Sequence, residues 1–186
     1  MICIYIYTNF KTMEAIKKEL EDLMNAVMVT FYSMMLMDEG NEKFMENKEG
    51  DQADEQFMEV LFGPVAPRIT ELMVQLAFSG ISEEEMEQFD PTSSLSTDKD
   101  EFMEKFSEYA EKAEQFMKTT SKENLIVIAQ VVKATAELNG IITDEEQTAI
   151  DEFCQEYGIT EEELKGSSDD AAWLDAFMNF DDESAS

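Results

Sequence analysis

The 186-residue sequence contains no histidine. Imidazole is the general base of Ser-His and Cys-His nucleophile systems and a ligand in most zinc and di-iron sites, so these chemistries are excluded. Cysteine is scarce as well, because only Cys3 and Cys154 occur, far apart and without metal-ligand spacing. A disulfide framework is therefore excluded. We expect a reducing, cytoplasmic location in which both thiols behave as small hydrophobic groups.

Basic residues are few: 13 lysines and arginines stand against 43 acidic residues, and Arg68 is the only arginine. The resulting net charge of -30 repels nucleic-acid phosphates and anionic lipid headgroups, so direct binding to either is not expected. Three interpretations of this charge are open. It keeps the protein soluble, it binds a basic partner (mimicry of nucleic acid included), or it adapts the protein to a salty cytoplasm. The 14 methionines and 13 phenylalanines argue against the last.

Long hydrophobic runs are also missing. The longest apolar stretch, residues 23–37, is interrupted by polar residues and is shorter than the roughly 20 residues that span a bilayer, so no membrane insertion is expected. Residues 1–10 are apolar but have neither the basic start nor the small-residue cleavage site of a secretory signal. We interpret residues 1–12 as an N-terminal extension.

What the sequence does contain is apolar residues at helical spacing, which predict an all-α bundle of about seven to nine helices. The first helix begins near Thr12 and places one apolar face at Ile16, Leu20, Leu23, Val27, Phe31 and Met34. Its second half is apolar on all sides, as is typical of a helix that passes through the core.

The rest of the chain divides into further helices and polar connections. We expect a loop over 38–52, a helix over 53–62 that ends at Gly63-Pro64, and a helix from Pro67 to about Gly80 that buries Ile69, Leu72, Met73 and Leu76. A surface helix over 97–118 follows, with an apolar stripe at Phe102, Phe106, Tyr109, Ala113 and Phe116. Residues 124–138 form a central helix, for which Glu123 stands three residues after Thr120 as in a capping box. A last helix carries Ala172, Trp173, Ala176, Phe177 and Phe180, before a polar tail over 181–186.

This pattern fits a single helical domain or two helical halves, 13–90 and 97–180, divided near 90–97. The sequence alone leaves the oligomeric state open.

One local motif occurs at three joints, where glycine is followed by isoleucine, serine or threonine, and acidic residues. The joints begin at Gly80, Gly140 and Gly158. At each, the glycine can adopt the left-handed conformation that ends a helix. The hydroxyl residue caps the next helix, and a glutamate three residues later closes a capping box. The motif predicts helix-turn-helix connections.

Residues 122–166 resemble the TerB-like helical domain of tellurite-resistance proteins. The shared pattern is an apolar, alanine-containing helix, a turn at Asn139-Gly140, and a new helix that opens with Thr143 and acidic residues. The turn departs from the family's Ala-Asp-Gly, since Leu138 and Asn139 stand in its place. The resemblance implies a TerB-like C-terminal half, a stress- or defence-related role in membrane-linked complexes, and acidic clusters that handle cations. It does not imply an enzyme.

The same turn is similar to an EF-hand calcium loop with Gly140 at its sixth position and Glu146 at its twelfth. Its first position is Thr135, where an aspartate is expected. The candidate metal ligands, for calcium or magnesium, are Glu137, Asn139, Asp144, Glu145 and Glu146. No other cofactor is indicated.

The sequence favours a non-catalytic acidic interaction module that binds a cationic partner, either a basic protein surface or a divalent metal. The alternative is an inhibitor that mimics nucleic acid and occupies a DNA- or RNA-binding cleft. A second alternative is a magnesium-dependent all-α nucleotide hydrolase, which would use the pairs Glu101/Glu104, Glu108/Glu111 and Glu111/Glu114. These pairs lie among lysines, as on a solvated helix face, and no glycine-rich phosphate loop accompanies them, so an enzyme is disfavoured.

Overall fold

The computed structural model describes residues 11–46, 51–96 and 99–165, and within these ranges the chain forms helices and no strand. The helices are α1 (Met13–Met37), α2 (Glu39–Glu46), α3 (Asp51–Phe78), α4 (Glu83–Gln88), α5 (Lys99–Glu104), α6 (Phe106–Met117), α7 (Lys122–Ala136), α8 (Asp144–Tyr157) and α9 (Glu161–Lys165). The predicted all-α bundle is confirmed. The expected helix over 172–180 lies outside the described residues, as does most of the N-terminal extension.

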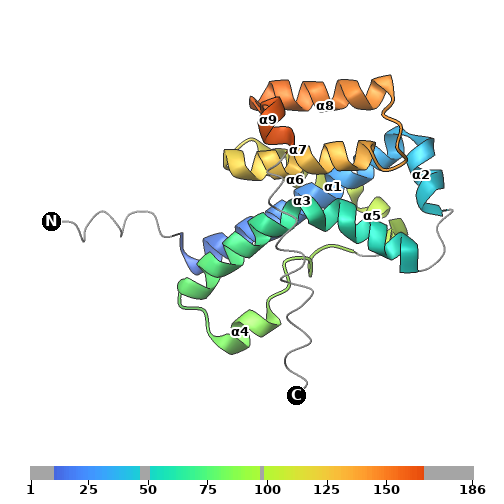
Figure 1. Cartoon of the computed structure of the whole chain (residues 1–186). Coiled ribbons are helices and arrows are strands. Elements are labelled where there is room, and N and C mark those ends of the chain that lie inside the picture. Colours follow the sequence, from blue (N-terminus) through green and yellow to red (C-terminus); the bar gives the residue numbers. More distant parts are fainter. Residues whose placement is uncertain (1–10, 47–50, 97–98, 166–186) are drawn as a thin grey trace, which may run out of the picture.

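The centre of the bundle is α1, which packs against α3, α6 and α7 (Figure 1). All six residues of its predicted apolar face are buried, and its second half is buried on almost every side. Thr12 is the N-cap, as predicted, and its side chain accepts a hydrogen bond from the Ala15 backbone N–H. The main hydrophobic core gathers side chains from α1, α3, α5, α6 and α7. The ranges on either side of residues 90–97 therefore share one core.

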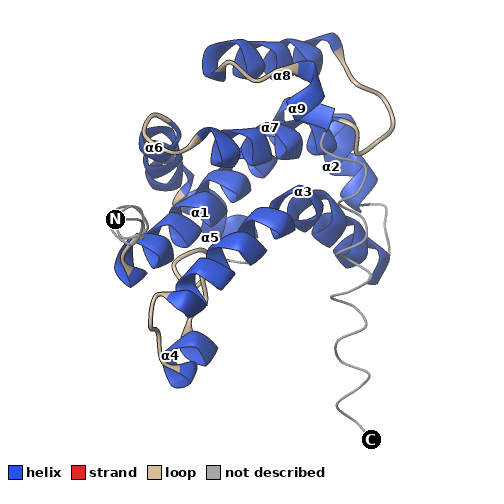
Figure 2. Cartoon of the chain, turned by 60° about the vertical axis from the view of Figure 1, so that its left-hand side comes forward, coloured by secondary structure: helices blue, strands red, loops and turns tan. Residues whose placement is uncertain are grey.

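Above this core the helices form a further layer. Figure 2 shows α7 lying across α1 and α3, and α8 with α9 lying on the outer side of α7. Two small apolar clusters hold this outer layer: Ile150 of α8 packs with Val132 and Ala136 of α7, and Ile159 packs with Leu125 and Ala129. No helix in the described part of the chain is long and apolar enough to cross a membrane.

The loop expected over 38–52 is wrong, because α2 and the start of α3 occupy much of it. At Asp38 the backbone is extended and ends α1, and its carboxylate accepts a hydrogen bond from the Gly40 N–H at 2.8 Å. Asn41 then bonds to residues about a hundred positions later in the chain. These hydrogen bonds to distant residues stabilise α2, although its own sequence is typical of a loop.

The helix break expected at Gly63-Pro64 is also wrong, since α3 contains both Pro64 and Pro67. A proline inside a helix removes a hydrogen bond and costs about 3 kcal/mol. Leu61 and Val65, on either side of Pro64, are fully buried in the main core. Burying these apolar side chains stabilises the helix and offsets the cost of the prolines. Helix propensity, which describes only the local sequence, does not include this contribution.

The single helix expected over 97–118 is instead α5 followed by α6, with Lys105 between them at φ -101° and ψ 5°. The rings of Phe102 and Tyr109 stack across this break with centroids 4.9 Å apart. The predicted stripe itself is confirmed, because Phe102, Tyr109, Ala113 and Phe116 are buried and Phe106 is partly buried against the core.

The capping box predicted for the central helix is wrong in position. The N-cap of α7 is Ser121, and its side chain makes no capping bond. The Thr120 hydroxyl instead accepts a hydrogen bond from the side chain of Asn124 at 2.7 Å. Asn124 belongs to a buried network with Arg68 and Glu19, which competes with the local capping geometry.

Candidate binding site

The three glycine joints adopt the conformation that their sequence predicts. Gly80, Gly140 and Gly158 have φ angles of +91°, +79° and +64°. Ser82, Thr143 and Thr160 then accept hydrogen bonds from the backbone N–H of the glutamate three residues later, and each glutamate accepts a bond in return. Two of these joints, at Gly140 and Gly158, set the positions of α8 and α9.

The joint at Gly158 attaches α9 to α7. Glu163 forms an ion pair with Lys122 at 2.7 Å, and the Gln130 side chain donates to the Glu163 carbonyl at 2.9 Å. The side-chain bond from Lys122, followed by those from Thr160, lowers the pKa of Glu163 to about 2. The carboxylate therefore stays ionised at neutral pH and keeps its contact with the start of α7.

The joint at Gly140 attaches α8 to the end of α1 through a buried hydrogen-bond cluster. Glu146 is fully buried and accepts a bond from the Asn41 side chain at 2.7 Å. Asn41 in turn accepts from the Asn139 N–H at 3.2 Å, and the Asn139 side chain donates to Asp38 at 2.7 Å. We refer to Asp38, Asn41, Asn139 and Glu146 as the polar clasp.

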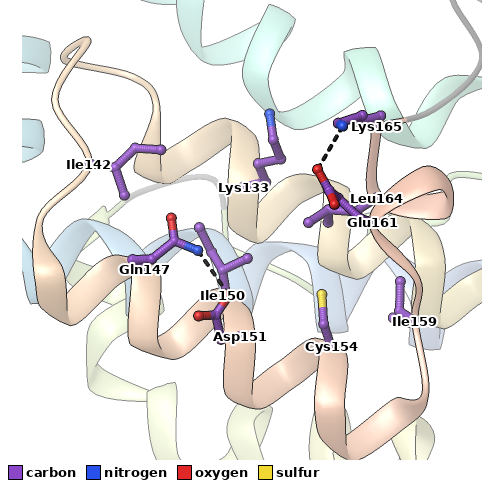
Figure 3. A pocket seen from close by; sticks show the side chains of 10 residues that line it. All are labelled: Lys133, Ile142, Gln147, Ile150, Asp151, Cys154, Ile159, Glu161, Leu164 and Lys165. Atoms are coloured by element: carbon purple, nitrogen blue, oxygen red, sulfur yellow. Dashed lines mark hydrogen bonds and ion pairs between the residues drawn. The ribbon is translucent and has the colours of Figure 1, made fainter.

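Between α7, α8 and α9 lies a groove of about 520 Å³ (Figure 3). Its lining comes from Lys133, Ile142, Gln147, Ile150, Asp151, Cys154, Ile159, Glu161, Leu164 and Lys165. Apolar side chains form much of this surface. The lysines around it are already engaged, since Lys165 pairs with Glu161 at 2.7 Å and Lys133 with Glu137 at 2.7 Å. The groove is therefore suited to apolar side chains of a ligand.

Cys154 is partly buried in this groove. Burial raises the pKa of its thiol, and the nearby negative charge of Asp151 acts in the same direction. The thiol is therefore protonated at neutral pH and contributes to the groove as a small apolar group, because the thiolate is the nucleophilic form of cysteine.

The outer face of α8 is strongly acidic. It exposes Asp144, Glu145, Asp151, Glu152 and Glu156, and the helix contains no basic residue. None of these carboxylates forms an ion pair with a described residue. We call these five residues the α8 acidic face. They lie on the same helix as Ile150 and Cys154, which line the groove.

The acidic residues of α5 and α6 differ from this face. Lys105 pairs with Glu101 at 3.2 Å, Lys112 with Glu108 at 2.7 Å, and Lys118 with Glu114. These three are among the five glutamates that a magnesium-dependent hydrolase would use. Lysines four residues along the chain neutralise them, as on an ordinary solvated helix.

The five metal ligands suggested by the sequence do not converge on one point. Glu137 forms an ion pair with Lys133 at 2.7 Å, while Asp144 and Glu145 are exposed in the first turn of α8. Asn139 and Glu146 do meet, at Asn41 of the polar clasp. Across the described residues, no group of three or more cysteine or carboxylate side chains is placed to hold a metal ion.

The first residues of the candidate calcium loop belong to helix α7. Thr135, the first position of that loop, is buried inside α7 and donates its hydroxyl hydrogen to the Val131 carbonyl at 2.8 Å. Residues 135–146 form the end of α7, a tight turn and the capping box that opens α8.

Comparisons with protein-family models, with curated proteins and with solved structures found no match to this chain. The TerB-like resemblance of residues 122–166 stays a prediction.

Sequence reasoning missed Asp38 and Asn41, because their partners lie far along the chain and nothing local distinguishes them. The α8 acidic face does have a signal in the sequence. No lysine or arginine occurs between Lys133 and Lys165, whereas basic residues recur through 99–118.

Proposed function

We propose that this protein is a non-catalytic binding module for a basic, amphipathic helical segment of another protein. Apolar side chains of that segment would enter the groove between α7, α8 and α9. Its lysines or arginines would lie against the α8 acidic face. This extends the expectation of a cationic partner by specifying where the partner binds and which shape it has.

The observation that carries the proposal is that the groove and the α8 acidic face share one helix, with Asp151 belonging to both. Charge alone is common on an acidic protein, but here Asp151, one of the unpaired carboxylates, lines a surface that apolar side chains can fill, and the other four lie on the same helix. Helix recognition of this kind combines apolar anchors in a groove with charges at its edge. At 14 residues, α8 is about 21 Å long, which matches about four turns of a bound helix.

The test is a titration of the full-length chain with a synthetic leucine–lysine peptide of about 14 residues that forms an amphipathic helix. A second peptide has the same composition in an order that gives no apolar face. We expect the amphipathic peptide to bind more tightly than the reordered one, and both to weaken with added salt. Equal binding of the two peptides would mean that charge alone is responsible, and the groove proposal would fail.

Matched variants locate the site. Replacing Asp151, Glu152 and Glu156 by their amides removes three charges from α8, and each exposed pair contributes about 0.2–1 kcal/mol. We expect about a tenfold loss of affinity, which corresponds to about 1.4 kcal/mol. The control variant replaces Glu108, Glu111 and Glu114 of α6 by glutamine, which changes the net charge equally. If both variants lose the same affinity, the charge of the whole molecule decides binding.

The nucleic-acid mimic remains an alternative because the α8 acidic face lies along a single helix, as a row of phosphates would. Mimicry requires the carboxylates and not the apolar groove. Changing Ile142, which lines the groove, to glutamine should therefore weaken an amphipathic partner but leave a mimic unaffected. Competition by a partner's own nucleic acid would favour mimicry.

A further inference from the structure

The groove lies where the described part of the chain ends, because Lys165 is both the last residue of α9 and part of the lining. The sequence that follows begins with Gly166 and a short polar stretch up to Asp170. Residues 171–180 are then predominantly apolar, with Asp175 and Asn179 as the only polar residues. These two lie four apart, so a helix over 171–180 would have one narrow polar stripe and one broad apolar face.

We propose that residues 171–180 of the same chain occupy the groove between α7, α8 and α9. Trp173, Phe177 and Phe180 are spaced at i, i+4 and i+7 and would face the groove together. Aromatic side chains bury about 150–250 Å² each, so they are suited to an apolar surface formed by residues such as Ile150 and Leu164.

The length of the intervening chain permits this arrangement. Residues 166–170 span at most about 17 Å when extended. A helix over 171–180 is about 15 Å long, which is shorter than α8. The segment can therefore return along the groove from Lys165 without unfolding α9.

Charge distinguishes this occupant from a partner protein. Residues 166–186 contain no lysine or arginine, so the segment and the α8 acidic face repel each other. Apolar contact must outweigh this repulsion, and added salt should strengthen the docking because it screens like charges. A basic partner has the opposite salt dependence.

A regulatory consequence rests on the proposed function: the segment would compete with a basic amphipathic partner for the same groove. The docking itself does not depend on that function. A partner would displace the segment by combining apolar contact with attraction to α8, whereas an apolar ligand without basic residues would be excluded.

The test uses Trp173, the only tryptophan in the chain, as a fluorescent reporter in the full-length protein. We expect its emission at shorter wavelength, and its quenching by acrylamide several-fold weaker, than in the chain unfolded by urea. Changing Phe177 to serine should move both towards the unfolded values. Changing Ile142 to glutamine should do the same, while the matched control Ile141 to glutamine should not, because Ile141 is 68% exposed and does not line the groove.

A second measurement follows the thiol of Cys154 in a Cys3→Ser background. Docking should slow its reaction with a thiol reagent, and Trp173→Ser with Phe177→Ser should restore a faster rate. Unfolded-like emission in the native protein would overturn the proposal. A buried Trp173 whose emission does not change in the Ile142→Gln variant would also overturn it. An emission that depends on protein concentration would overturn it as well, because it would indicate docking between two copies of the chain. Failure of the leucine–lysine peptide to bind the Trp173→Ser, Phe177→Ser variant, together with a buried Trp173 in the native protein, would instead overturn the proposed function alone.

Discussion

The polar clasp makes a quantitative prediction for the variant Asn41→Leu. Leucine has the same branched outline as asparagine but cannot donate to Glu146 or accept from the Asn139 N–H, which Asn41 does at 2.7 and 3.2 Å. A hydrogen bond to a charged group contributes about 1.5–3 kcal/mol, and leaving a buried polar group without a partner adds to the loss. Asn41 and Glu146 are both 0% exposed, so water cannot replace the lost bonds. We expect the free energy of unfolding to fall by about 3 kcal/mol.

The assay is urea unfolding at neutral pH, followed by the far-ultraviolet circular dichroism of the helices. The midpoint should fall while its dependence on urea stays constant, because the same surface is exposed. A double-mutant cycle with Glu146→Gln isolates the bond, and we expect a coupling of about 2 kcal/mol. Glu85→Gln is the matched control, since Glu85 occupies the same place in an exposed capping box and should show no coupling with Asn41. A loss under about 1 kcal/mol for Asn41→Leu would refute this account of the clasp.

Four further predictions concern the core and its edges. Gly63→Ala should raise the free energy of unfolding by about 1 kcal/mol, because a Cβ meets open space there and alanine favours a helix. Gly40→Ala should lower it, because the new Cβ would lie 2.8 Å from the side-chain nitrogen of Asn139, and urea midpoints of the two variants test both signs. Phe102→Ala should lower the free energy of unfolding by about 3–5 kcal/mol, because the fully buried ring is removed from the aromatic cluster of the main core. Calorimetry or urea unfolding measures the loss, and wild-type stability in this variant would contradict the packing described. For Glu19, burial raises the pKa but is outweighed by hydrogen bonds from lysine and asparagine side chains and by positive charge, so the pKa is lowered overall. The ionised Glu19 side chain therefore stabilises the fold above the unfolded-state pKa of about 4.3, and this contribution is lost as the pH falls. The difference in free energy of unfolding between wild type and Glu19→Gln should accordingly shrink from pH 7 to pH 3.

Local sequence signals predicted the elements with strong periodicity or capping. The apolar face of α1, the stripe of α6 and the three glycine joints all lie where the sequence places them. These features depend on residues within a few positions of one another. The predicted breaks at 38–52 and at Gly63-Pro64 were wrong, because contacts between distant segments outweigh the local preference there.

The candidate site was predicted only in part. The sequence named Asn139 and Glu146 among five candidate metal ligands. The structure places Asn41 beside both, which is a partner about a hundred residues earlier. Asn41, which belongs to α2, donates a hydrogen bond to the Glu146 carboxylate.

By itself, the sequence determined the helical class, the net charge of -30, the absence of histidine chemistry and the three capped joints, since each follows from composition or from neighbouring residues. The tertiary structure alone decided which of those joints is buried. The capping glutamate is exposed at Glu85 but completely buried at Glu146. It also decided that Asp151, an unpaired carboxylate of α8, lines an apolar groove, because that surface forms only when α8 and α9 pack on α7. Local motifs set the ends of helices, and packing between helices decides what each end contacts.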